Sequence, residues 1–242
     1  MVSTAIVLPV NIGRQPDDVS CGQTCLQALY AYYGRRVTRR KLMASVPSLD
    51  EGGTLGVTLA LDALSRGFQA RMVTWNLLVF DPTWFEPDAA PLPERLRMRA
   101  RAKRRNRKLS NTAMAYADFA DAGGQIEFRD LTPALIIDSL QRGVPILTGL
   151  SATFLYRECR HRTSDDKADD LRGDPVGHFV ILTGYDPKQR TVLVTDPLHP
   201  NALSDVHTYP ITMDRLVGAI YLGVLTYDAN LIMIEPPATA RA

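Results

Sequence analysis

Four polar residues in three distant stretches of the chain have the types needed for thiol attack on a carbonyl group: Gln15, Cys21, His178 and Asp196. A thiol nucleophile needs a favoured thiolate, a base that holds its proton, and a third group that orients the base. The apolar spacing after Cys21 predicts an amphipathic helix over about 21–33, with Ser20 as its N-cap. Because a helix N-terminus favours an anion, Cys21 is the candidate nucleophile.

The candidate base and its partner lie on neighbouring strands of a predicted hairpin. His178 stands near the start of the apolar segment 177–186, and Asp196 lies near the end of the segment 191–197. Residues equidistant from the turn of an antiparallel hairpin face each other, and the midpoint of this pair falls inside the turn. A shift of two in register would make them diagonal neighbours on one face. The carboxylate would then hold one imidazole nitrogen and leave the other for the thiol.

The amide of Gln15 comes just before the predicted helix, where it could donate a hydrogen bond to a developing oxyanion, with the backbone N–H of Cys21 as second donor. Two other interpretations of Cys21 stay open at this level. It could be a buried structural thiol, as free cysteines usually are. It could also join Cys25, Cys159 and His161 in a zinc site, although their spacing is unusual for zinc. We expect no metal and no cofactor.

The composition is that of a soluble globular protein with one sizeable core. Of 242 residues, 45% are hydrophobic and 22% charged, and the net charge is +2. Three cysteines are too few for a disulfide framework, and no secretion signal is recognisable, so we expect a cytoplasmic protein. No stretch approaches the roughly 20 apolar residues that a membrane helix needs.

Periodicity predicts helices mainly in the first two-thirds of the chain and strands mainly in the last third. Helices are expected over 38–46, 54–67, 111–124 and 132–143, and strands beyond the hairpin over 68–75, 144–151 and 230–236. This segregation favours an α+β fold over a parallel array of alternating strands and helices. We expect a helical N-terminal half packed on an antiparallel β-sheet C-terminal half, with the cleft between them.

The motifs "Q-x5-C-G-x-x-C-L", "G-H-F-V-I-L-T-G-Y-D" and "V-x-D-P" occur in the order Gln, Cys, His, Asp. Together they resemble the bacteriocin-processing (double-glycine leader) cysteine peptidases, which belong to the papain-like superfamily. The resemblance covers about 15–65 and 130–228. It implies a papain-like fold with Cys21 as nucleophile, His178 as general base and acid, Asp196 as orienting group and Gln15 as oxyanion donor.

Three features depart from the pattern of that family. Ser20 stands where an acidic residue usually precedes the cysteine, and Asp17 and Asp18 lie further upstream. No fused membrane transporter is recognisable. The compact core is interrupted by an insertion at about 81–125 and by a charged loop at about 157–175. The double-glycine preference therefore does not transfer to this chain on the resemblance alone.

We expect a single domain over 1–235, followed by a disordered tail over 236–242. Within the insertion, residues 94–108 hold nine Arg or Lys residues and one Glu. Such a run is most often a solvated helix face. It could instead bind an acidic peptide or protein, or pair with the acidic part of the charged loop. Nucleic acid is disfavoured as a partner because no aromatic residue interrupts the run.

The predicted activity is hydrolysis of a peptide or other amide bond through a Cys-His-Asp triad and a thioester intermediate. One alternative is capture of the thioester by an amine, which would make the protein an acyltransferase or a peptide-modifying enzyme. Another is a catalytically retired domain that binds peptides, although the intact set of four residues speaks against it.

Overall fold

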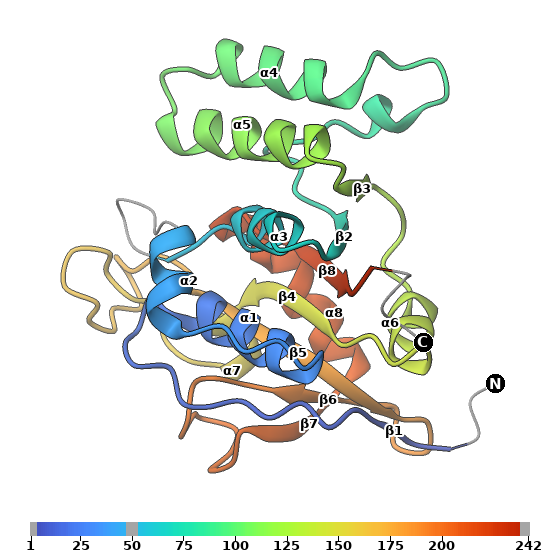
Figure 1. The fold of residues 1–242 in the computed structure, drawn as a ribbon. Coiled ribbons are helices and arrows are strands. Elements are labelled where there is room, and N and C mark those ends of the chain that lie inside the picture. Colours follow the sequence, from blue (N-terminus) through green and yellow to red (C-terminus); the bar gives the residue numbers. More distant parts are fainter. Residues whose placement is uncertain (1–3, 47–52, 238–242) are drawn as a thin grey trace.

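The computed structural model describes residues 4–46 and 53–237, and its sheet runs through the centre of the molecule (Figure 1). The strands are β1 (Ile6–Val7), β2 (Gln69–Thr74), β3 (Gln125–Glu127), β4 (Ile146–Ser151), β5 (Gly177–Asp186), β6 (Thr191–Thr195), β7 (Thr208–Thr212) and β8 (Asn230–Glu235). Their order is β3-β2-β8-β4-β5-β6-β7, with β1 paired to β5. Among these pairings, β2 with β3 is parallel and the others are antiparallel. The predicted antiparallel sheet is confirmed.

Helices cover both faces of this sheet. They are α1 (Cys21–Tyr32), α2 (Arg39–Ser45), α3 (Gly56–Ser65), α4 (Leu92–Ala102), α5 (Arg107–Asp121), α6 (Pro133–Gln141), α7 (Ala152–Tyr156) and α8 (Met213–Leu222), with short 3-10 turns η1 (Pro82–Phe85) and η2 (Gly223–Thr226). One core packs α1, α3 and α5 against the sheet, and the other packs α6, α7 and α8 against its opposite face. The fold is α+β, as predicted.

The division into a helical half and a sheet half is less strict than expected. The strand β2 comes from the N-terminal half and β3 from just past the middle of the chain, and both extend the sheet beyond β8. Conversely, α6, α7 and α8 lie in the C-terminal half of the chain. The reason is that β4 is buried along its whole length, so apolar helices must cover both of its faces.

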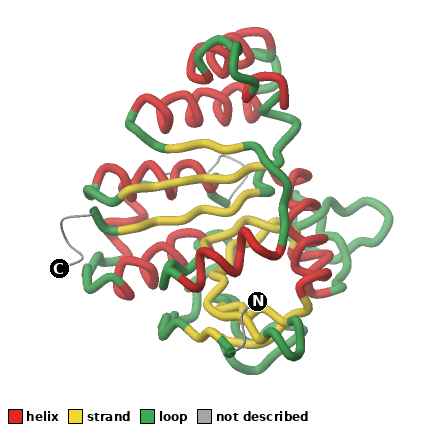
Figure 2. Tube along the Cα trace, turned by 90° about the vertical axis from the view of Figure 1, so that its right-hand side faces the viewer, coloured by secondary structure: helices red, strands yellow, loops and turns green. Residues whose placement is uncertain are grey.

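The predicted insertion at 81–125 forms a helical hairpin of α4 and α5, which lies side by side with α3 at one end of the molecule (Figures 1 and 2). Its apolar side chains belong to the same core as α1, since Leu96, Tyr116 and Phe119 are fully buried there. The basic run 94–108 is not one continuous helix. Residues 94–102 of the run belong to α4, residues 103–106 form a turn, and Arg107 and Lys108 begin α5.

The charged loop at 157–175 is held together by contacts among its own residues. His161 forms isolated β-bridges with Ala168 and Asp174, and Arg162 pairs with Asp165. Of the predicted tail at 236–242, residues 238–242 lie outside the described residues. None of the described helices is long and apolar enough to span a bilayer.

Candidate active site

Cys21 is the first residue of α1 and is 7% exposed. Ser20 occupies the N-cap position as predicted, but its side chain makes no capping bond to the helix. Its hydroxyl donates instead to the carboxylate of Asp17, which also accepts the backbone N–H of Val19 at 3.1 Å. Asp17 therefore shapes the turn that leads into α1, and the first N–H groups of the helix are not capped by the Ser20 side chain.

Cys25 lies one turn deeper on α1 and is fully buried. Its thiol donates to the backbone oxygen of Phe179 at 3.3 Å. Burial, followed by the nearby Cys21 and Asp196, raises the pKa of the Cys25 thiol well above its ordinary value. Cys25 is therefore a packed thiol that joins α1 to β5, not a second nucleophile.

His178 is the second residue of β5 and is 6% exposed. Its Nε2 lies 2.8 Å from Oδ1 of Asp196. The other ring nitrogen, Nδ1, is left for the thiol of Cys21, which interacts with the same imidazole. The structure thus brings Cys21, at the start of α1, together with His178 and Asp196 from the distant β5–β6 hairpin.

A β-bulge between β5 and β6 places Asp196 on the same face of the sheet as His178. Near the turn, Gly184 pairs with Leu193, but beyond the irregularity Leu182 pairs with Val194. Thr183 is therefore the extra residue on β5. Continuing the shifted register places Asp196 level with Val180, two residues from His178 and on the same face. The two residues are diagonal neighbours, which was the second of the two predicted arrangements, and without the bulge Asp196 would face the other way.

The carboxylate of Asp196 is fully buried and surrounded by donors. Its Oδ2 accepts the hydroxyls of Tyr156 at 2.6 Å and Tyr209 at 2.5 Å. Its Oδ1, besides contacting His178, accepts the backbone N–H of Leu198 at 2.9 Å. Burial and then the charge of Asp196 raise the pKa of both tyrosines, so they stay protonated donors.

These contacts set the charges of the His178–Asp196 pair. Burial alone would lower the pKa of His178, but the charge and hydrogen bond of Asp196, aided by Cys21, raise it to about 10. Burial would likewise raise the pKa of Asp196, but the charge of His178 and the bonds from His178, Tyr156 and Tyr209 hold it below its ordinary value. The arrangement therefore holds an imidazolium beside a carboxylate at neutral pH.

Gln15 reaches the site from the chain segment before α1. Its backbone N–H donates to the carbonyl oxygen of Pro197 at 3.0 Å, which ties it to the residue after Asp196. One N–H of its side-chain amide donates to the carbonyl oxygen of Asp17 at 2.9 Å. Its Oε1 is buried without a partner in the described structure. This side-chain amide makes no other hydrogen bond among the described residues.

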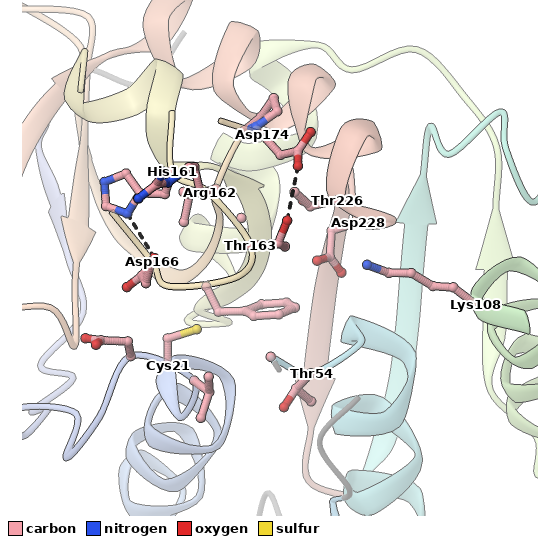
Figure 3. Close-up of a pocket in the computed structure, with 17 residues that line it drawn as sticks. Cys21, Thr54, Lys108, His161, Arg162, Thr163, Asp166, Asp174, Thr226 and Asp228 are labelled. Carbon is pink, nitrogen blue, oxygen red and sulfur yellow. Dashed lines mark hydrogen bonds and ion pairs between the residues drawn. The ribbon is translucent and has the colours of Figure 1, made fainter. Parts of the chain in front are cut away.

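Two adjoining cavities flank these side chains. The larger, about 440 Å³, is lined by Cys21, Phe179 and Thr54 and reaches Asp228 and Lys108 at its far side (Figure 3). The smaller, about 150 Å³, is lined by Gln15, His178 and Tyr156 among others. The charged loop contributes His161 and Asp166 to both cavities, so it forms a shared wall of the cleft.

The model of the Peptidase_C39 like family matches residues 97–221, about half of the chain. The chain belongs to the Peptidase_C39 like family. The matched span contains His178 and Asp196, while Cys21 and Gln15 lie before it. It also contains most of the α4–α5 hairpin, which the sequence resemblance had left unexplained.

Solved structures also resemble this chain, at 12–15% sequence identity. A C39-like protein from Bacillus anthracis has a TM-score of 0.51 at 15% identity, covering 96% of this chain and 98% of its own. The peptidase domain of Streptococcus ComA, a bifunctional ABC transporter of a quorum-sensing pathway, has a TM-score of 0.44 at 14% identity, covering 94% and 98%. A double glycine motif protease from an AMS/PCAT transporter, solved with its leader peptide, also gives 0.44, at 12% identity, covering 95% and 94%. No curated protein matches the sequence.

Family membership confirms the predicted class, a papain-like cysteine peptidase of the Peptidase_C39 type. The assignment of catalytic roles to individual residues stays a prediction. Within this Peptidase_C39-like fold, the zinc alternative has no support, because the described residues include no group of three or more His, Cys, Asp or Glu side chains that could hold a metal ion.

Sequence reasoning missed the two tyrosines that bond to Asp196. Tyr209 could have been found from strand pairing, since it is level with Val194 on the face that Asp196 shares two residues later. Tyr156 ends the short helix α7, and nothing in the local sequence signals its contact. The far wall of the larger cavity, with Asp228 and Lys108, was also not anticipated.

Proposed function

We propose that this chain hydrolyses a peptide bond with Cys21 as nucleophile, His178 as general base and acid, Asp196 as orienting group and Gln15 as oxyanion donor. One observation carries the proposal. The imidazole of His178 is held by Asp196 through Nε2 at 2.8 Å, and the thiol at the head of α1 interacts with the same ring. A thiol, a base and an orienting group in this order are the elements of thiol acylation chemistry.

The reaction would run in two halves. The sulfur of Cys21 attacks the carbonyl carbon and forms a tetrahedral oxyanion. The proton on Nδ1 of His178 passes to the departing amine as the C–N bond breaks, which leaves a thioester on Cys21. A water molecule then gives its proton to Nδ1 and attacks the thioester, and the acid product leaves with the thiolate restored.

The raised pKa of His178, about 10, fits the first half of this cycle because the ring carries a proton at neutral pH. The oxyanion would be stabilised by the second amide N–H of Gln15 and by the backbone N–H of Cys21 at the helix terminus. Asp196 would stabilise the imidazolium and fix its orientation. No metal or cofactor is needed for any of these steps.

Peptides are the substrate class that we propose. The two cavities give room for chain on either side of the Cys21 sulfur. We further propose an acidic partner for the basic run 94–108. A cytoplasmic location is supported by Cys21, Cys25 and Cys159, which are all free thiols.

The proposal is tested by alkylation of the intact protein with iodoacetamide at neutral pH, followed by mass spectrometry and peptide mapping. Cys21 should react first, because its thiol interacts with the imidazole of His178, whereas Cys25 is fully buried and no hydrogen bond engages the exposed thiol of Cys159 among the described residues. His178→Ala should slow the reaction at Cys21 and leave that at Cys159 unchanged. Equal rates at Cys21 and Cys159 in the unmodified protein would contradict the proposed activation.

Hydrolysis is separated from acyl transfer by product masses. A peptide library incubated with the protein should yield free carboxyl termini that depend on Cys21, and Cys21→Ala should yield none. If an added primary amine appears quantitatively in the products, the enzyme is a transferase on the same residues. If Cys21→Ala and the unmodified protein bind peptides equally and neither turns them over, the domain is a binding module.

A further inference from the structure

The positive charges of the run 94–108 fall into two groups in the structure. The first group, on α4, takes part in the packing of the hairpin. Arg97 pairs with Asp121 on α5, and Arg99 donates to the backbone oxygen of Leu78 at 2.8 Å. The Nε of Arg95 is buried. These three side chains are structural and offer little charge to a partner.

The second group lies at the end of α4, in the turn and at the start of α5, and is exposed: Arg101, Lys103, Arg104, Arg105 and Arg107. Among the described residues, no ion pair or side-chain hydrogen bond engages any of these five cations. They form a compact cationic surface, which we call the basic turn. Five like charges held this close repel one another, so the turn gains from an anionic partner.

The basic turn continues directly into the cavity that holds Cys21. Lys108 follows Arg107 and lines this cavity, and its ammonium lies 5.1 Å from the centre of the Tyr227 ring (Figure 3). Asn106 in the turn contacts the Tyr227 hydroxyl at 3.4 Å. Tyr227 precedes Asp228, which forms the far wall of the cavity. The turn is thus fixed at one mouth of the cleft.

The charged loop at 157–175 does not neutralise the basic turn. Three of its carboxylates pair with basic side chains of the same loop: Asp165 with Arg162 and Lys167, Asp166 with His161, and Asp169 with Arg172. In the part of the chain that the structure describes, none of them pairs with the basic turn. The intramolecular pairing considered from the sequence therefore has no support here.

We infer that the basic turn is a docking surface for an acidic segment of the peptide substrate, located a few residues along the chain from the bond that Cys21 attacks. The inference rests on the proposed function and names its substrate class. Rim charges act mainly on encounter and on weak binding rather than on the chemical step. The turn should therefore lower KM for acidic substrates and leave kcat unchanged. A nucleic acid is the less favoured occupant, because the run contains no aromatic residue on which bases could stack.

The test measures binding without turnover, using full-length Cys21→Ala protein and fluorescein-labelled decapeptides in an anisotropy titration. One probe alternates Glu with Gly, and the matched probe alternates Gln with Gly. The test variant carries Lys103→Glu, Arg104→Glu and Arg105→Glu. The matched control carries Arg36→Glu, Arg39→Glu and Arg40→Glu, which reverse three equally exposed charges beside and on α2.

The acidic probe should bind more tightly than the neutral one, and its affinity should fall with added salt. The test variant should weaken binding by about tenfold or more, and the control variant should have much less effect. A milder set, Lys103→Gln, Arg104→Gln and Arg105→Gln, should give an intermediate loss and guards against misfolding of the reversed variant. Equal losses in the test and control variants would overturn the inference, as would tighter binding of a single-stranded oligonucleotide of the same charge.

The position of the surface is tested on the unmodified protein. An acidic probe extended by a neutral tail should slow the alkylation of Cys21 by iodoacetamide, whereas the acidic segment alone should not. If the extended probe binds but gives no protection, the basic turn does not feed the cleft and the inference fails. This outcome leaves the proposed function standing, because that function is judged by the rate and the Cys21 dependence of the chemistry.

Discussion

Two buried aspartates lie near the candidate nucleophile, and their pKa values are shifted in opposite directions. Asp196 is fully buried, and its pKa is held below the ordinary value by His178, Tyr156 and Tyr209 against the effect of burial. Asp228 is 5% exposed, and burial raises its pKa to about 7. Its Oδ1 accepts the backbone N–H of Gly56 at 3.2 Å and the side-chain amide of Asn230 at 3.3 Å.

The difference between the two carboxyl groups lies in their partners, not in their depth. Asp196 has a cationic ring and two hydroxyls within 2.8 Å, whereas Asp228 has two longer contacts to neutral donors. Lys108 lowers the pKa of Asp228 but does not offset its burial. A carboxylate fit to orient an imidazolium therefore needs a full set of close donors, because burial without them raises its pKa.

The strongest test of this comparison replaces each aspartate in turn by asparagine, which removes its charge. We expect Asp196→Asn to slow alkylation of Cys21 and peptide hydrolysis by roughly 10²–10⁴-fold, because the imidazolium loses its charged partner. Asp228→Asn is the matched control and should change the alkylation rate little. Similar losses in both variants would show that the two carboxylates share the same role.

The second prediction concerns the pH dependence of folding at Asp228. The pKa of this carboxyl rises from 3.8 to about 7 on folding, so the native state binds more protons than the unfolded state within that window. The free energy of unfolding should therefore fall as pH rises from about 4 to about 7, by up to roughly 4 kcal/mol. Asp228→Asn should remove this fall and be the more stable protein at pH 7.

Urea titrations of both proteins across this pH range provide the measurement. Asn can still accept the Gly56 N–H, so the local geometry is kept. If the unmodified protein and Asp228→Asn lose stability in parallel as pH rises, Asp228 is ionised in the native state at all these pH values and the comparison with Asp196 fails.

The third prediction dissects the donors around Asp196. Tyr156→Phe and Tyr209→Phe each remove one hydrogen bond to a buried carboxylate, which should cost about 1–3 kcal/mol of stability. Each should also raise the pKa of Asp196, since a bond that lowered it is gone. In a plot of the rate of Cys21 alkylation against pH, the rise on the acidic side should then move to higher pH. Tyr32→Phe, which removes a bond to the Gly143 carbonyl away from the site, should leave the profile in place.

The smallest expected effect is at Lys108. Its charge lowers the pKa of Asp228, so Lys108→Met should raise that pKa further. In the urea titrations the pH-dependent loss of stability would extend to slightly higher pH. A shift in the opposite direction would mean that the ammonium does not act on this carboxyl.

Much of the active-site arrangement is written in local sequence patterns. The apolar periodicity after Cys21 predicts α1, and it begins at the residue expected. The hairpin of β5 and β6 follows from two β-rich runs around a short polar turn, and it places His178 and Asp196 near each other. These features depend on short-range physics, which a sequence displays directly.

The missed features depend on contacts between distant elements. The side-chain cap expected from Ser20 does not form, and its hydroxyl donates to the carboxylate of Asp17. The hydroxyl of Tyr156 reaches Asp196 across forty positions of chain. The opposite pKa shifts of Asp196 and Asp228 follow from partners gathered by the fold, so no window of the sequence could have distinguished the two carboxyl groups.

The single surplus residue on β5, Thr183, has a consequence for how the chain can vary. The buried strand residues around it can vary among apolar types, but the number of strand residues between the imidazole and the turn, and between the turn and the carboxylate, has a fixed parity. Deleting or inserting one strand residue should turn the carboxylate to the opposite face of the sheet, away from His178, although every proposed catalytic side chain would still be present. Insertions in the hairpin should therefore be tolerated in pairs or within the Pro187–Arg190 turn, and not singly along the strands.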